Sequence, residues 1–168
     1  MIERLDAFNK WLTTTGLSHA VAGRLPWVWP ACETLHFIGL AFLIGCIGVL
    51  DLRMLGFAKD MSISAVHKFV PWGVFGFALN AVTGTLFYIG APFQYVHNFA
   101  FQMKLLFLVI AGGNVLYFYW GGVMHRVEAL GPGADPPLTA KLVSLISIVS
   151  WFGVMYWGRM LPFVGNAF

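Results

Sequence analysis

The sequence predicts an all-α integral membrane protein, an up-down bundle of four membrane-spanning helices preceded by an N-terminal amphipathic helix at the membrane interface. Of its 168 residues, 59% are hydrophobic and only 10% are charged, and the mean hydropathy is +0.77. So few charged side chains do not cover the surface of a water-soluble domain. Four apolar stretches also reach the length of about 20 residues that a spanning helix needs. Lipid is therefore the expected surrounding medium.

The four predicted spans fall at about 27–50, 70–89, 99–123 and 138–163, within one bundle domain over 26–168. A helix satisfies its own backbone polar groups, which hydrocarbon does not do, so each span is expected to be helical. Between the spans lie DLRMLGFAKDMSISAVHK, GAPFQYVHN and HRVEALGPGADPP, which we interpret as turns. Short connections favour antiparallel neighbours, and hence the up-down order.

Residues 1–25 are predicted to form a segment that lies on the membrane surface. Ile2, Leu5, Phe8 and Leu12 recur at helical spacing, with charged residues between them. This pattern is typical of a short amphipathic helix at the interface. A disordered tail is the alternative.

The distribution of basic residues gives an expected orientation. Five basic residues flank the first and third loops, and four stand at the opposite ends of the spans. The first set is Arg53, Lys59, Lys68, Arg126 and Lys141, and the second is Arg4, Lys10, Arg24 and Arg159. The positive-inside rule then places the first and third loops in the cytoplasm and both termini in the periplasm. The net charge of +3 is scattered along the chain, which argues against a nucleic-acid surface.

Small residues mark predicted contacts between helices. They follow one face of the second span (Gly73, Gly76, Asn80, Gly84) and of the fourth (Ser144, Ser147, Ser150, Gly153). Such stripes allow close helix packing in membranes. Gly112 and Gly113 suggest a close crossing or a bend in the third span.

Ionisable residues inside spans need an explanation, because burying them in lipid is costly. Glu33, His36, Lys104 and Arg159 all fall toward the end of the bundle that carries the termini. One interpretation is an interhelical ion pair between Glu33 and Lys104 that fixes the helix register. The other is a polar functional centre around His36.

The histidines suggest b-type haem as a cofactor. His36 and His97 belong to one side of the predicted bundle, and His67 and His125 to the other. Four-helix proteins that hold haem use ligands from two helices at similar depth. His36 is about 12 Å deeper than His97 if both helices are straight, so a methionine ligand to the haem on His36 is an alternative. The candidates for it are Met103, Met155 and Met160.

The sequence resembles a family of small bacterial four-helix membrane proteins of unknown function. The resemblance lies in WVWPACETLHFIGLAFLIG, DLRMLG, PWGVFGFALNAVTG, NFAFQMKLL and WGRML, and covers nearly all of the chain after the amphipathic segment. It implies the four-helix fold and a bacterial inner membrane. The family pattern includes the positions of Glu33, His36, Asp51, Arg53, Trp72, Gly84, Lys104 and Arg159. The chain is similar, more loosely, to membrane cytochrome b subunits and copper-resistance membrane proteins.

The leading functional hypothesis is a membrane electron-transfer subunit, not an enzyme by itself, that exchanges electrons between quinone and a partner protein through haem. Lys104 and Arg159 are expected to bind haem propionates or a quinone oxygen, and Glu33 to orient His36 or carry a proton. One alternative is transport or copper handling, in a homo-oligomer. The candidate copper ligands are His67, His125, Met54, Met61 and Met124. Another alternative is a cofactor-free subunit of a larger membrane complex.

Overall fold

The computed structural model describes residues 2–164, and these residues are almost entirely helical, with no β-strand among them. Four helices are long and apolar enough to cross a membrane. They are α3 (Val28–Leu55), α5 (Val70–Gly90), α7 (Phe99–Trp120) and α9 (Leu138–Met160). The short α4 (Ile63–His67) precedes α5. The four predicted helical stretches are thus confirmed as helices.

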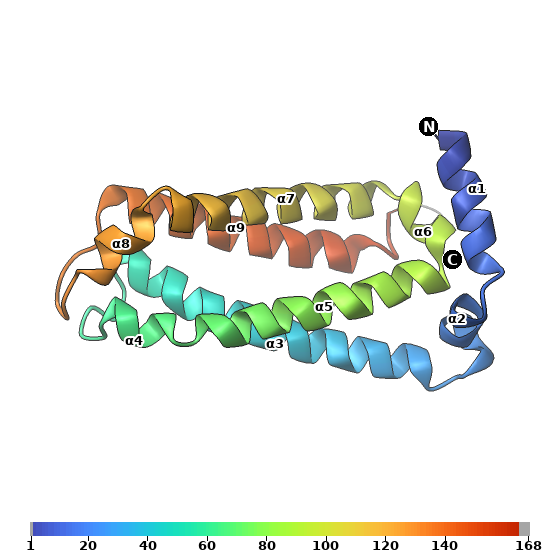
Figure 1. Ribbon diagram of the computed structural model, residues 1–168, viewed down its shortest axis with the longest axis horizontal. Coiled ribbons are helices and arrows are strands. Elements are labelled where there is room, and N and C mark those ends of the chain that lie inside the picture. Colours follow the sequence, from blue (N-terminus) through green and yellow to red (C-terminus); the bar gives the residue numbers. More distant parts are fainter. Residues whose placement is uncertain (1, 165–168) are drawn as a thin grey trace.

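The long helices form two pairs. α3 packs along α5, α7 packs along α9, and α3 also contacts α9, which joins the pairs. Figure 1 shows the two pairs lying one above the other with their long axes roughly aligned. α5 and α7 have no comparable contact along their lengths in the part of the chain described. The bundle is therefore open between these two helices.

The crossing of α3 and α5 depends on two glycines that lie against each other's backbone. A Cβ atom at Gly76 would stand 2.5 Å from the carbonyl oxygen of Gly39 and 2.7 Å from the amide nitrogen of Leu43. Both neighbours are backbone atoms, so neither can move away by a side-chain rotation. The predicted stripe of small residues on the second span is confirmed as a close helix contact. Two alternatives were expected at Gly112 and Gly113, a close crossing or a bend. Neither glycine has an atom within 4 Å of a built Cβ, so the close crossing is wrong.

The first long helix continues past the predicted end of the first span. It ends at Leu55, and Gly56 follows with a left-handed φ of 103°. Gly56 and Phe57 donate their backbone N–H groups back to Arg53 and Leu52, the pattern of a glycine-terminated helix. Asp51 and Arg53, which the sequence analysis assigns to a turn, are therefore helical and buried.

Arg53 joins the first and third loops at this end of the bundle. Its side chain is 1% exposed. Its Nε donates to the carbonyl of Met61 at 2.6 Å, and its Nη2 lies 3.3 Å from the carbonyls of Lys59 and Ala134. The two loops are not simple turns, since they contain α4 and α8 (Val123–Glu128). One guanidinium group thus holds segments that are 75 residues apart in sequence, from Lys59 to Ala134.

A surface ion cluster reinforces the same end. The carboxylate of Asp135 lies 2.8 Å from Nζ of Lys59 and 2.6 Å from Nζ of Lys141. Hydrogen bonds from Lys141 and Lys59 lower the pKa of Asp135 from 3.8 to about 2. The group is exposed, so solvent screens much of its contribution to stability.

The N-terminal segment lies across the other end of the bundle, beside α6 (Pro92–Val96) (Figure 1). It comprises α1 (Ile2–Thr13), α2 (Gly16–His19) and one π-helical turn, η1 (Ala20–Arg24). A helix is present in the predicted segment. Its side chains Asn9 and Leu12 are buried, whereas Leu5 and Phe8 are exposed. The side chain of Ile2 lies outside the described residues.

Candidate functional site

His36 is held in a defined orientation by the neighbouring helix. Its Nδ1 lies 2.7 Å from Oγ1 of Thr83 on α5, and the Phe87 ring packs 5.6 Å away, centre to centre. The Thr83 hydroxyl also lies 2.8 Å from the carbonyl of Leu79. In the tautomer with the proton on Nδ1, the hydroxyl donates to Leu79 and accepts from the ring. That tautomer leaves the lone pair of Nε2 uncommitted.

Glu33 is paired with an indole, not with a lysine. Nε1 of Trp29 donates to Oε1 of Glu33 at 3.1 Å. Burial, and to a smaller degree the charge of Glu33, raises the pKa of Tyr95 to about 12. Among the described residues no ion pair joins Glu33 to Lys104. The interpretation of these two residues as a register-fixing ion pair is therefore wrong.

The two cations of the predicted centre have different surroundings. Lys104 is partly buried beside Gly158, where a built Cβ would lie 3.8 Å from Nζ. Arg159 is exposed and lies over the ring of Phe163, 5.3 Å from its centre. Lys104 is thus a partly buried residue beside α9, whereas Arg159 is a surface residue.

Three of the four candidate haem ligands have partners other than those predicted. His36 binds Thr83. His97 is largely exposed, and its Nε2 lies 3.3 Å from Oδ1 of Asp6, which ties α6 to α1. His67 places its Nε2 2.9 Å from the hydroxyl of Tyr119. The fourth candidate, His125, is exposed on α8.

The copper alternative finds no assembled site. Within residues 2–164, no three His, Cys, Asp or Glu side chains gather as metal ligands do. Met54 and Met124 are buried in an apolar cluster that also contains Val66 and Phe118. Met61 is exposed. Met54 and Met124 are explained by packing.

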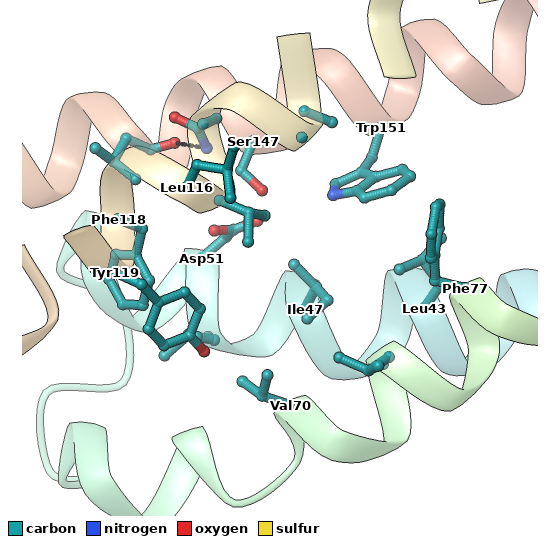
Figure 2. Close-up of a pocket in the computed structure, with 18 of the residues that line it drawn as sticks. Leu43, Ile47, Asp51, Val70, Phe77, Leu116, Phe118, Tyr119, Ser147 and Trp151 are labelled. Atoms are coloured by element: carbon teal, nitrogen blue, oxygen red, sulfur yellow. Dashed lines mark hydrogen bonds between the residues drawn. The ribbon is translucent and has the colours of Figure 1, made fainter. Parts of the chain in front are cut away.

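A cavity lies between the two helix pairs, where α5 and α7 do not meet. Its volume is about 420 Å³, and all four long helices contribute to its wall. Figure 2 shows Leu43, Ile47, Phe77 and Leu116 around it. The lining is mainly apolar, as in sites for small organic molecules.

Two polar groups in this cavity lack partners. Asp51 is 3% exposed and its Oδ2 has no hydrogen-bond partner among the described residues. The hydroxyl of Ser147 faces the same carboxyl group (Figure 2). Trp151 is 9% exposed, and its Nε1 is also unpaired in the described chain. Most buried polar groups in proteins are hydrogen-bonded, so two unpaired ones in one cavity call for an explanation.

Asp51 was not among the predicted site residues, although the family pattern includes its position, because the predicted first span ends at about residue 50. The signal for a longer helix is Gly56, a residue type that commonly follows the last helical turn. Extending the span to Gly56 brings Asp51 inside the helix. Trp151 has no such signal in the sequence, because a tryptophan in a span is ordinarily a packing residue.

Comparison of the chain with models of protein families, with curated proteins and with solved structures gives no match. The cavity and the His36 region are therefore the features from which a function is inferred.

Proposed function

We propose that the protein crosses a bacterial inner membrane as an up-down four-helix bundle and binds a small, largely apolar molecule that enters its cavity from the lipid. The proposal rests on the apolar cavity between α5 and α7. Exposed apolar residues such as Val74 and Val115 stand at its edge and suit contact with acyl chains. The basic residues of the first and third loops support a cytoplasmic position for that end.

The size of the cavity supports a bound molecule. Protein interiors are close-packed, and an unfilled cavity lowers stability in proportion to its volume. A space of about 420 Å³ is within the range of small-molecule sites. Apolar cavities hold water poorly and accept apolar guests.

Two neighbouring glycines allow a matched test of this proposal. Gly112 lines the cavity and Gly113 does not, and neither has an atom within 4 Å of a built Cβ. We expect Gly112→Leu to fill the cavity, and Gly113→Leu to leave it open. The measurement is binding of durene, an apolar tetramethylbenzene, to purified protein in lipid nanodiscs. Wild type and Gly113→Leu should bind it, and Gly112→Leu should lose at least about tenfold in affinity.

Two results count against cavity binding. One is a wild-type protein that takes up no more durene than empty nanodiscs. The other is equal binding by the two leucine variants, provided that both unfold at the wild-type temperature.

A b-type haem bound through His36, in an electron-transfer subunit, is a second candidate. It is favoured by the orientation of His36, because ligating histidines usually bond a protein group through their other ring nitrogen, and Nδ1 of His36 lies 2.7 Å from Thr83. Lys104 is partly buried, and its ammonium group suits a propionate. The fit is incomplete, since His97 faces Asp6 and His36 does not line the cavity between α5 and α7. When bound, haem would supply one-electron chemistry.

An absorption spectrum tests the haem candidate separately from the cavity. Reduced-minus-oxidised difference bands of the purified protein should disappear in His36→Ala and persist in His125→Ala. Absence of such bands in wild type, after expression with a haem precursor, removes haem from the proposal. It leaves durene binding unaffected.

A further inference from the structure

We infer that the molecule bound in the cavity is a quinone, a flat apolar ring with oxygen atoms on opposite sides, one bonded to Asp51 and the other to Trp151. This inference rests on the proposed function and names the ligand class for the same cavity. It goes beyond apolar binding, because it assigns a partner to each of the two unpaired polar groups.

Both polar groups of the cavity need a partner. Asp51 is 3% exposed and Trp151 is 9% exposed, so bulk water reaches neither well. Leaving a buried donor or acceptor without a hydrogen bond costs on the order of the lost bond itself. One ligand that supplies both missing bonds removes both penalties.

The two groups lie at different positions along the cavity. Ser147, which neighbours Asp51, and Trp151 are four residues apart on α9, so their backbones differ by about 6 Å of helix rise. The carboxyl group of Asp51 lies beside Ser147, and Figure 2 shows the indole of Trp151 at a separate position along the cavity. Apolar side chains, among them Ile47, line the space between them. A matching ligand therefore has a short apolar body with a polar atom at each end.

The chemistry of the two groups limits the kind of polar atom at each end. The indole N–H only donates, so the ligand must present an acceptor to Trp151. A carboxyl group accepts, and in its acid form also donates. A quinone carbonyl can accept from the indole N–H, and the other carbonyl can accept from the acid form of Asp51. The hydroxyls of the reduced quinol can donate to Asp51 and accept from Trp151.

Other guests satisfy fewer of these requirements. A lipid acyl chain fills the apolar volume but leaves both groups unpaired. A hydrophobic amine pairs with Asp51 and, being a donor, leaves Trp151 without an acceptor. Of these three kinds of guest, the quinone is the one that pairs both ends while keeping an apolar body against the cavity wall.

Two probes with the same carbon skeleton distinguish the contribution of the ring to binding from the contribution of its oxygen atoms. Duroquinone carries two carbonyl oxygens, and durene has none. In nanodiscs we expect wild type to bind duroquinone at least about tenfold more tightly than durene. Asp51→Leu and Trp151→Phe should each weaken duroquinone binding about fivefold, the value of one ordinary hydrogen bond. Durene binding should change less than about twofold.

Matched controls keep the test interpretable. Trp157→Phe removes an indole of the same helix that does not line the cavity, and it should have no effect. Asp51→Asn retains a donor and an acceptor, and it should recover most of the affinity lost in Asp51→Leu. This recovery also shows that the loss is not a folding defect.

Each other outcome has a defined meaning. Equal binding of the two probes, insensitive to Asp51 and Trp151, overturns the quinone assignment and leaves apolar binding in place. Tighter binding of the amine probe dodecylamine, lost only in Asp51→Leu, also overturns it. Failure of both duroquinone and durene to bind removes the proposed function as well.

Discussion

Asp51 and Arg53 lie two residues apart near the end of α3, and their side chains have different surroundings. Arg53 reaches three backbone carbonyls of the two adjacent loops. Asp51 turns into the cavity, where one of its oxygens has no partner in the described structure. Because both are buried, each carries a large desolvation cost. Arg53 offsets much of that cost through these three carbonyls, although its Nη1 has no hydrogen-bond partner among the described residues. For Asp51, we propose that a bound molecule offsets it.

The role of Arg53 predicts a stability defect on substitution. Arg53→Lys keeps the charge but not the planar fork that reaches several carbonyls at once. Hydrogen bonds to charged groups contribute about 1.5–3 kcal/mol each, so we expect a loss of about 2–4 kcal/mol of unfolding free energy. Urea unfolding in detergent micelles measures it. Arg126→Lys, at an exposed site, is the control, and equal effects of the two changes contradict the assignment.

The Asp135 cluster predicts a pH dependence. The pKa of the Asp135 carboxyl group is lowered to about 2. The contribution of this carboxylate to stability is therefore fully present above the pKa of the unfolded chain, near 4. The contribution is lost as the pH falls from about 4 to about 2. Asp135→Asn should therefore unfold at a lower temperature than wild type at about pH 6, and the two melting temperatures should converge near pH 2. High salt should also reduce the difference. A gap that persists at low pH in high salt contradicts an electrostatic origin.

For single residues, the sequence indicates which side chains need an explanation but does not indicate their partners. Glu33, His36 and Lys104 were identified because charges in apolar spans are rare. Their neighbours could not be inferred, since a helix rotation of one residue changes which helix a side chain faces. Glu33 pairs with Trp29 on its own helix, and His36 with Thr83 on the next. The hydropathy of the sequence indicates neither of these two pairings.

The helices themselves were predictable from length and apolarity, and their ends were less so. The four stretches were placed correctly, but α3 extends to Leu55 and α7 ends at Trp120, before two glycines. Spacing of small residues correctly identified the Gly76 contact. It was wrong for Gly112 and Gly113, because a small residue equally suits a helix contact and an open space. Which of the two applies depends on how the helices pair, α3 with α5 and α7 with α9.

The close crossing of α3 and α5 predicts a position-specific effect of one methyl group. Gly76→Ala places a Cβ against the backbone of Gly39 and Leu43, so the two helices must move apart. Overpacking of this kind costs about 1–3 kcal/mol. Gly45→Ala, with nothing within 4 Å of the new Cβ, should be neutral or slightly stabilising, since alanine favours helix. Similar unfolding curves for the two variants contradict the crossing.

The whole molecule has two distinct ends, and the proposed up-down insertion assigns them to opposite sides of the membrane. Figure 1 shows α4 and α8 at one end and α1, α2 and α6 at the other. Asp60 and Gln94 are exposed residues at these two ends, so each can carry a single cysteine once Cys32 and Cys46 are replaced by alanine. We expect Asp60→Cys to be shielded from a membrane-impermeant maleimide in intact spheroplasts and Gln94→Cys to react. Labelling of both from outside contradicts the topology, and reversed labelling contradicts only the orientation.

The anchoring of both loops by Arg53 also determines how the bundle can deform. Arg53 holds the first and third loops together at one end, and at the other end the short α6 connects α5 to α7. The gap between α5 and α7 is therefore restrained at both ends. Parting of the two helices is left to the stretch between these ends, which includes Val74 and Val115 at the edge of the cavity. A guest arriving from the lipid would then enter sideways between these two residues, without passing along the bundle, and meet Asp51 directly.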